Sequence, residues 1–335
     1  MVNQKHHTPT LYSPWPNNHT GQVRKVSFEL EYVGISIEES CHILQNLFAG
    51  NIDVLNDNEH HVSNTRLGTF IVELDAHLLK EMAEKSKNNV ANEKFDWEGY
   101  VQKAISSALK NVIPLEIKTP PMPVEQLGVL DLIIPELSKV GAKDTHTSSI
   151  AAFGLHINTD VPSLASDKII AFLQAYVLLS DWLRMKIDID LTRMLSTYIN
   201  EYPANYQKLI LNQEYQPTLN TLIDDYLSYN PTRNRALDML PLFAFIDKDR
   251  VFSKVTPTLI KPRPTFHYRL ANSNINDPNW NFTTEWNRWV YIEKLAANHA
   301  LRMNMINHHQ SLVTENILFP RAEWIKYTAA YLKQL

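Results

Sequence analysis

The chain has 335 residues, of which 44% are hydrophobic and 20% are charged, as is usual for a folded globular protein. Its 32 Lys and Arg residues against 36 Asp and Glu residues give a formal net charge of -4, so there is no overall drive toward nucleic acid or an acidic membrane. The single cysteine, Cys41, excludes an intrachain disulfide and a metal site built from several thiolates. Any anion must therefore be bound by a local group of basic side chains.

The first residues, "MVNQKHHTPTLYSPWPNNHTG", are polar and proline-rich and lack the apolar segment of a secretory signal. We predict an irregular arm over residues 1–22 and a cytoplasmic protein. The longest apolar run extends from Lys168 to Ile187, but Gln174, Asp181 and Arg184 interrupt it, which favours a buried helix over a membrane span. We expect neither a membrane nor a nucleic acid as a partner.

Runs of alternating apolar and polar residues predict five strands. In chain order they are "VSFELEYVG" (26–34), "LGTFIVELD" (67–75), "NVIPLEIKTP" (111–120), "AFGLHINTD" (152–160) and "PTFHYRLAN" (264–272). Apolar residues three and four positions apart predict helices over 38–48, 77–88, 97–112, 124–139, 167–187, 191–200, 217–229, 234–246, 286–308 and 320–333. The helix-rich part, about 161–250, is predicted to be an insertion into a single domain spanning 23–335.

Each predicted strand has one apolar and one polar side, because successive side chains on a strand point to opposite faces. In the first strand, Phe28 and Leu30 oppose Glu29 and Glu31. The polar sides of the other four carry Glu73 with Asp75, Glu116 with Lys118, His156 with Asn158, and His267 with Arg269. Fully buried parallel strands would be apolar on both sides, so the pattern predicts an α+β fold in which helices cover one face of an antiparallel or mixed sheet. The other face is predicted to be concave and polar, and to carry the function.

Five carboxylates would gather on that face if the strands are neighbours: Glu29, Glu31, Glu73, Asp75 and Glu116. Such crowding is destabilising unless cations or protons neutralise the charge. Carboxylates with one or two imidazoles suit Mg²⁺ or Mn²⁺ better than they suit structural zinc. The pattern therefore predicts a divalent metal site.

Magnesium that is held by few carboxylates commonly also holds phosphate oxygens, so a bound nucleotide is the next hypothesis. Lys118 and Arg269 are candidate phosphate ligands on the same face. The sequence has eight glycines and no glycine-rich phosphate loop or dinucleotide fingerprint, so metal ions and arginines would have to bind the phosphates.

The order of "FELEYVG", "GTFIVELD", "PLEIKTPPMP", "FGLHINTD", "PTRNRALDMLPLFAF" and "TFHYRLAN" resembles the amidoligase family. That family is related to glutamate-cysteine ligase and glutamine synthetase within the carboxylate-amine ligase superfamily, and the resemblance runs from about Phe28 to Arg269. It implies a glutamine synthetase-like catalytic fold. In the family, a Glu-x-Glu pair on the first strand and a glutamate on the third bind metal, and these fall on Glu29, Glu31 and Glu116.

Two positions depart from the family pattern. The closing strand usually has an acidic residue, an aromatic residue and an arginine, and here it has His267, Tyr268 and Arg269. A histidine can bind a divalent metal, but it removes one negative charge, which leaves the number of metal ions and the activity open. After Asp75 the chain has Ala76 and His77, where a serine would be expected soon after the acid.

The resemblance implies an ATP-dependent ligase, in which a substrate carboxylate attacks the γ-phosphate and an amine then displaces phosphate from the acyl phosphate to form an amide. The implied cofactors are ATP and Mg²⁺ or Mn²⁺, and the partners are a small-molecule or peptide carboxylate and an amine donor. The site residues expected on this basis are Glu29, Glu31 and Arg269 for catalysis; Glu29, Glu31, Glu116, His156 and His267 for metal; Lys118, Arg235 and Arg269 for the nucleotide; and Glu73, Asp75, Asn158 and Arg233 for substrate.

Other interpretations stay open at this point. The same acidic and histidine cluster suits a metal-dependent hydrolase that activates water, which would turn over without nucleotide. A ligand-binding protein of this fold without turnover is a third reading, based on His267. Arg233 and Arg235 equally suit a surface helix start. His156 could also be a strand histidine without a role in the site, but the resemblance favours a metal ligand or a substrate contact.

Overall fold

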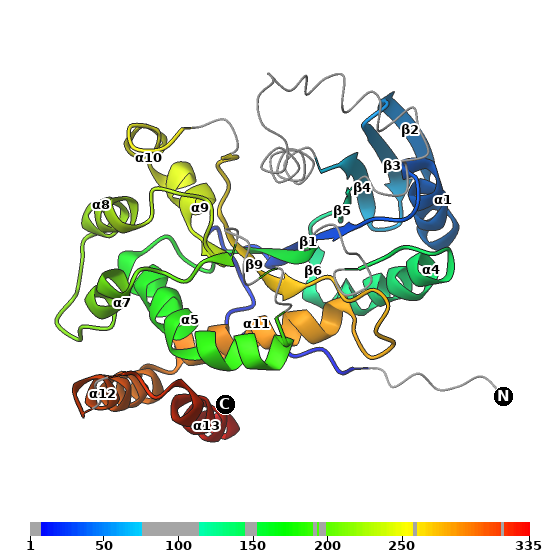
Figure 1. Ribbon diagram of the computed structural model, residues 1–335. Helices are drawn as coiled ribbons and strands as arrows, with labels where there is room; N and C mark the ends of the chain where they lie inside the picture. Colours follow the sequence, from blue (N-terminus) through cyan, green and yellow to red (C-terminus); the bar gives the residue numbers. More distant parts are fainter. Residues whose placement is uncertain are drawn as a thin grey trace, which may run out of the picture.

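The computed structural model describes residues 8–75, 114–144, 153–189, 193, 199–256, 260–315 and 318–335 (Figure 1). In these residues the chain forms an α+β fold around a nine-stranded sheet, and every strand pairing in it is antiparallel. The strands are β1 (Lys25–Tyr32), β2 (Asn51–Asn56), β3 (Glu59–Thr65), β4 (Gly68–Leu74), β5 (Leu115–Lys118), β6 (Met122–Pro123), β7 (Gly154–Asp160), β8 (Leu237–Asp238) and β9 (Thr265–Asn272). Their order is β2-β3-β4-β5-β1-β7-β9-β8, with β6 also paired to β1. The predicted α+β class and antiparallel sheet are confirmed.

Strand β1 lies in the middle of the sheet, between β5 and β7. Phe28, Leu30 and Tyr32 are fully buried on one face, as the alternating pattern predicted. Glu29 and Glu31 extend from the opposite face. The register therefore fixes which face of the molecule carries the acids, because a shift by one residue would bury the acids and expose the aromatic rings.

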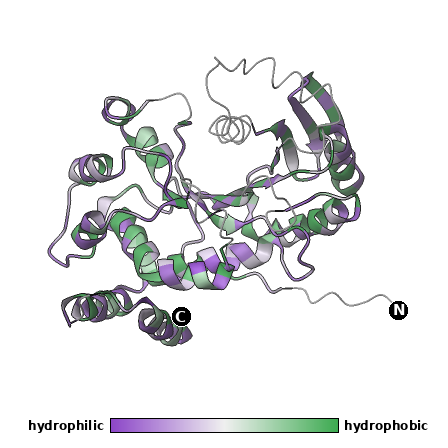
Figure 2. Ribbon diagram, in the orientation of Figure 1, coloured by the Kyte–Doolittle hydropathy of each residue, from purple (hydrophilic) through white to green (hydrophobic). Residues whose placement is uncertain are grey.

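Helices cover the apolar face of the sheet. They are α1 (Ile37–Phe48), the 3₁₀ helix η2 (Val124–Leu132), α4 (Ile133–Lys139), α5 (Ser166–Ile187) and α11 (Phe282–Ala297). Rings from β1 and α11 are in edge contact at Phe28 and Phe282, 5.1 Å apart, and rings from α5 and β9 meet at Phe172 and Phe266, 4.3 Å apart. In Figure 1, α4, α5 and α11 lie beneath the sheet, and Figure 2 shows hydrophobic residues gathered along α4 and α5. The core therefore lies between this helical layer and the sheet.

The remaining helices lie outside that layer. They are α7 (Ala204–Ile210), α8 (Leu219–Tyr229), α9 (Leu240–Ile246), α10 (Lys248–Phe252), α12 (His299–Glu315), α13 (Arg321–Tyr331) and the 3₁₀ turn η5 (Leu332–Gln334). Helices α12 and α13 pack against α5, whereas α9 packs against β9. None of the described helices combines the length and the apolar character that crossing a membrane requires.

Several predicted helices have different bounds in the structure. The predicted helix 286–308 is two helices, because the backbone leaves the helical conformation at Asn298 and its side chain then caps α12 by accepting from the Leu301 N–H at 3.0 Å. The predicted helix 234–246 begins only at Leu240, since Leu237 and Asp238 pair with β9 as strand β8. The predicted helix 124–139 is 3₁₀ over its first part.

The hairpin of β2 and β3 was not predicted. Its strands carry many polar residues, and alternation is weak in "NIDVLN" and "EHHVSNT". The predicted helices 77–88 and 97–112, and most of 191–200, lie outside the described residues, as do Ala76 and His77.

The N-terminal segment is irregular from residue 8 to residue 24, apart from a bridge between Asn17 and Val23, and it is firmly packed. The Leu11 N–H donates to Asn287 Oδ1 at 2.7 Å. At its end, Arg24 Nη2 contacts Glu293 Oε1 at 2.6 Å, and both side chains are buried. The segment is thereby tied to α11 across the apolar side of the sheet.

Candidate functional site

Polar side chains form three rows across neighbouring strands on the face opposite the helical layer. Cross-strand pairing brings together Glu73, Glu116 and Glu31 in the first row; Lys118, Glu29 and His156 in the second; and Asn158, His267 and Asp238 in the third. Side chains directly opposite each other on antiparallel strands are close enough to interact. The predicted metal residues Glu29, Glu31, Glu116, His156 and His267 are thus brought together, with three further predicted residues between them.

Glu29 lies at the centre of these rows and accepts two hydrogen bonds. Its Oε2 is 3.0 Å from His156 Nδ1, and its Oε1 accepts from Asn158 Nδ2 at 2.8 Å. Burial acts to raise the pKa of Glu29, but the hydrogen bond from His156 and the electrostatic effects of His267, His156 and Lys118 outweigh it, so the pKa lies well below its usual value. Glu29 is therefore ionised.

Glu31 and Glu116 have the opposite character. Both side chains are 7% exposed. Burial and the charge of Asp75 raise the pKa of Glu31 to about 8, although the Gly154 N–H donates to its Oε2 at 2.6 Å. Burial and the charge of Glu29 likewise raise the pKa of Glu116 well above its usual value. Glu31 therefore holds a proton that a cation would displace, whereas Glu116 lies 3.0 Å from the Lys118 ammonium group.

His156 connects Glu29 and Glu31, because its Nε2 lies 3.3 Å from Glu31 Oε1 while its Nδ1 faces Glu29. Burial lowers the pKa of His156 to about 4, despite the hydrogen bond with Glu29. The ring is then neutral and carries one proton. Since ionised Glu29 can only accept, the proton is on Nδ1, and protonated Glu31 donates to Nε2. Two acids in one site thereby hold opposite protonation states.

Lys118 lies among the acids of β4 and β5. Its Nζ is 2.5 Å from Glu73 Oε1 and 3.0 Å from Glu116 Oε2. Burial acts to lower the pKa of Lys118, but Glu116, Glu29 and Glu73 outweigh burial and raise it. The lysine is charged and already paired, so its predicted role in binding phosphate would require it to leave one of these carboxylates.

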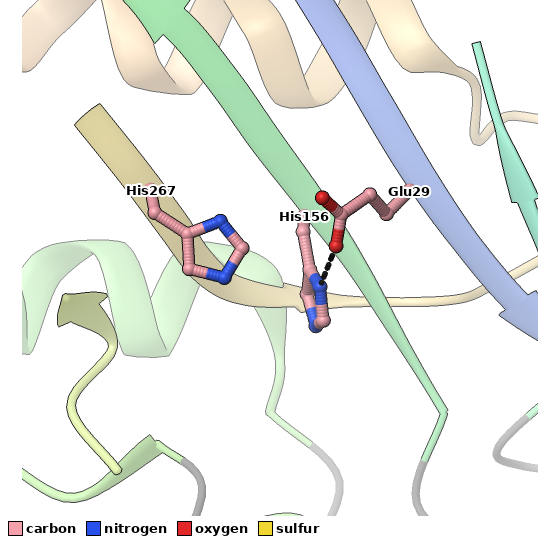
Figure 3. A group of neighbouring side chains, drawn as sticks. All are labelled: Glu29, His156 and His267. Atoms are coloured by element: carbon pink, nitrogen blue, oxygen red, sulfur yellow. Dashed lines mark hydrogen bonds and ion pairs between the residues drawn. The ribbon is translucent and has the colours of Figure 1, made fainter. Parts of the chain in front are cut away.

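His267 lies across the site from Glu29, and Figure 3 shows its two nitrogens on the ring edge turned toward His156. The two imidazole rings are 5.3 Å apart. His267 Nδ1 is 2.8 Å from Asn158 Oδ1, and the same oxygen accepts from Arg263 Nη2 at 2.7 Å. His267 is 2% exposed, and its buried Nε2 has no hydrogen-bond partner among the described residues.

Arginines surround the far end of the third row. Arg269 Nη2 is 3.5 Å from Asp238 Oδ2, and Arg233 Nε is 4.0 Å from the same oxygen. Burial raises the pKa of Asp238 against the effect of both arginines, and burial lowers the pKa of Arg233. Arg193 donates from Nη2 to the carbonyl oxygen of Arg269 at 2.7 Å. The pairing of β7 and β9 shifts register between Leu155 and Ile157, close to where Arg269 lies, and such irregularities re-aim side chains.

Arg235 lies apart from the three rows. Its Nε donates to Asn230 Oδ1 at 2.7 Å and its Nη1 to the carbonyl oxygen of Asn234 at 3.2 Å. The structure brings Arg233, but not Arg235, next to the acid of β8. The predicted nucleotide-binding role of Arg235 stays a prediction.

Sequence reasoning missed Arg263, Asp238 and Arg193. Arg263 has the same parity as His267 and Arg269, so extending the last predicted strand by one residue would have placed it on the polar face. Asp238 was hidden inside a predicted helix. Arg193 gave no signal, because its neighbour in the fold, Gly154, is 39 positions away in the chain.

Two groups of side chains in the described part of the chain have donor atoms close enough to hold a metal ion. They are Glu29, His156 and His267, and Glu31, Glu116 and His156, each with its donor atoms within 4.8 Å of one another. The first group offers two nitrogens and one oxygen, and the second offers one nitrogen and two oxygens. Hard ions prefer the second group and borderline ions the first.

Comparison with known proteins gives one family. A family model described as "Putative amidoligase enzyme" matches residues 22–291, which include all three polar rows and the arginines around them. No curated protein and no solved structure gives a match to this chain. Because the family model covers most of the chain, including every strand of the site, the protein belongs to this amidoligase family.

Proposed function

We propose that this protein is an ATP- and Mg²⁺-dependent ligase that joins a carboxylate to an amine through an acyl phosphate. The observation that carries the proposal is the pairing of a buried carboxylate cluster with a buried arginine group along one sheet face. Glu31, Glu116 and Arg269 are each less than 10% exposed. Phosphoryl transfer depends on positioning and on positive charge where negative charge develops, which this pairing would supply.

The residues of the acidic rows fit a divalent ion. Burial opposes ionisation of Glu31 and Glu116, so an ion would relieve the cost of burying charge. Glu29, Glu31 and Glu116 would hold Mg²⁺, and His156 lies beside them. When bound, the ion supplies charge neutralisation and orientation at the phosphate oxygens.

The basic side chains would bind the other anions of the reaction. Arg269, whose Nη2 lies 3.5 Å from Asp238 and whose carbonyl oxygen accepts from Arg193, would bind phosphate oxygens. Arg233 is less tightly paired, at 4.0 Å from Asp238, and is 30% exposed, which suits a substrate carboxylate. Lys118, Glu73, Asp75 and Asn158 complete the proposed nucleotide and substrate contacts.

Calorimetry of ATP binding with and without Mg²⁺ tests the proposal. Glu29→Gln combined with Glu31→Gln should abolish the Mg²⁺-dependent part of binding, because it removes two oxygen ligands while keeping side-chain size. Glu125→Gln, at an exposed position on η2, is the matched control and should bind as the wild type does. Urea unfolding of each variant separates loss of the site from loss of the fold.

Release of ADP with mixtures of carboxylates and amines then tests turnover. A wild type that binds no ATP, or that binds it equally well without the two glutamates, would rule out this site assignment. Hydrolysis of amides or esters without nucleotide would instead favour the metal-dependent hydrolase, and ligand affinity without any turnover would favour a binding protein.

A further inference from the structure

His267 changes the chemistry of one side of the site. With Glu29 and His156 it forms a group of two imidazoles and one carboxylate whose donor atoms lie within 4.8 Å of one another. Metal bonds of about 2.1 Å would bring such donors to about 3.4 Å apart, a modest contraction. Two imidazoles and a carboxylate are a ligand set for borderline ions such as Zn²⁺ and Co²⁺ rather than for Mg²⁺.

The hydrogen bonds around Asn158 decide which nitrogen of His267 is free. Because Glu29 can only accept, the Asn158 amide nitrogen faces it, and the amide oxygen faces His267. That oxygen accepts from Arg263, and it accepts from Nδ1–H of His267. The opposite tautomer would put two acceptors 2.8 Å apart and bury an N–H without a partner. The contact of Nδ1 with Asn158 Oδ1 is shorter than its contact with Arg263 Nη2 at 3.1 Å, which favours the proton on Nδ1 and a lone pair on the buried Nε2, an atom with no partner among the described residues.

His156 also has an outer partner for one nitrogen. If its Nδ1 binds an ion together with Glu29, its Nε2–H faces Glu31 Oε1 at 3.3 Å. Metal-bound histidines in proteins commonly donate their second N–H to a carboxylate or a carbonyl oxygen. Glu31 would accept a hydrogen bond from the second N–H of His156, as Asn158 accepts one from His267. Both imidazoles would then have the hydrogen-bond acceptor that metal-bound histidines usually have.

Arg263 sets the charge of this side of the site. Its Nη2 lies 4.0 Å from Glu29 Oε1 and 3.1 Å from His267 Nδ1. The guanidinium offsets the negative charge of the single carboxylate, which weakens the binding of any ion that is held mainly by electrostatic attraction. An ion held by imidazole nitrogens is less affected, because neutral ligands supply two of its bonds.

We propose that Glu29, His156 and His267 form a binding site for a divalent transition-metal ion of the Zn²⁺ or Co²⁺ type, beside the oxygen-rich group of Glu31 and Glu116 that suits Mg²⁺. The inference rests on the proposed function only for the use of the ion in catalysis. The preference of the site for Zn²⁺ or Co²⁺ over Mg²⁺ follows from the ligands and can be measured without nucleotide.

The test is titration of the full chain with Co²⁺, followed by visible absorption, and then displacement by Zn²⁺ or Mg²⁺. We expect one saturable Co²⁺ with an imidazole-type spectrum, displaced by equimolar Zn²⁺ but not by about a hundredfold excess of Mg²⁺. His267→Gln should abolish this spectrum, and His42→Gln, at an exposed position, should leave it unchanged.

Two further variants keep the test decisive if His267→Gln folds poorly. His267→Asp should retain a metal site but shift its preference from Zn²⁺ toward Mg²⁺, because an oxygen ligand replaces a nitrogen. Asn158→Leu removes the outer partner of His267, and Co²⁺ affinity should fall by about 10- to 100-fold. Asn158 would thus be a positioning residue in this site.

The proposal is overturned if the wild type binds no Co²⁺ or Zn²⁺, if Mg²⁺ displaces Co²⁺ as easily as Zn²⁺ does, or if the Co²⁺ spectrum is the same in His267→Gln. Failure here can be told apart from failure of the proposed function. Mg²⁺-dependent ATP binding that is retained with no transition-metal site would remove only the present inference, whereas Co²⁺ binding without any ATP binding would remove only the ligase.

Discussion

Gly154→Ala tests how the strand β7 holds the arginine group in place. A methyl group at Gly154 would lie 3.0 Å from Arg193 Cζ and well inside contact distance of its Nη1. The position is in a regular strand, so the alanine backbone itself is unstrained. The conflict is therefore with the buried guanidinium, which donates to the carbonyl oxygens of Phe153 and Arg269, each at 2.7 Å.

The expected cost follows from those two bonds. Hydrogen bonds from a charged group contribute about 1.5–3 kcal/mol each, and displacement of Arg193 weakens one or both of them. The lower backbone entropy of unfolded alanine returns about 0.4–1 kcal/mol. Gly154→Ala should therefore lower the free energy of unfolding by about 2–4 kcal/mol.

A double-mutant cycle in urea, with Arg193→Met as the second change, separates this cause from others. In the Arg193→Met background Gly154→Ala should be neutral or slightly stabilising, because the guanidinium is gone. Equal costs in the two backgrounds, or a Gly154→Ala cost near zero in the wild type, would refute the reasoning. Weaker Mg²⁺-dependent ATP binding by Gly154→Ala would further show that the packing of Arg193 against Gly154 affects the position of Arg269.

Two more predictions concern stability away from the site. Arg24→Met should lower the free energy of unfolding by about 3–5 kcal/mol, because buried Glu293 keeps the Trp289 N–H but loses its countercharge, and adding Glu293→Leu should restore much of the loss in urea unfolding. Burial lowers the pKa of His309 to about 4, so the unfolded chain binds more protons between pH 6.5 and that value, and stability falls as the pH falls through this window. His309→Gln should remove about 3 kcal/mol of this pH dependence, measured as the difference from wild type, and an unchanged pH profile would contradict it.

Much of the candidate site could be predicted because its information is local. Strand alternation alone placed Glu29, Glu31, Glu116 and His156 on one face, since parity within a strand needs no knowledge of its neighbours. The opposition of protonation states between Glu29 and Glu31 could not be predicted, because it depends on which groups each carboxyl meets across the sheet.

The parts that were missed depend on contacts distant in sequence. Asp238 is on a two-residue strand whose existence depends on pairing with β9, so the local pattern of its neighbours, which form α9, dominated the prediction. Arg193 contacts Phe153 and Arg269 from a separate segment, and no local pattern marks it. The break at Asn298 is likewise visible only when its side chain is seen to cap α12.

The central place of β1 has a consequence for how the chain folds as it is synthesised. This strand leaves the ribosome well before both of its main partners, β5 and β7. Arg24 finds Glu293 across 269 positions of sequence. The chain must lose the entropy of closing these long loops before the stabilising contacts form. Folding should therefore be slow, and it should be largely complete only after α11 has emerged. Until then the apolar face of β1 is uncovered and the strand is open to wrong pairing.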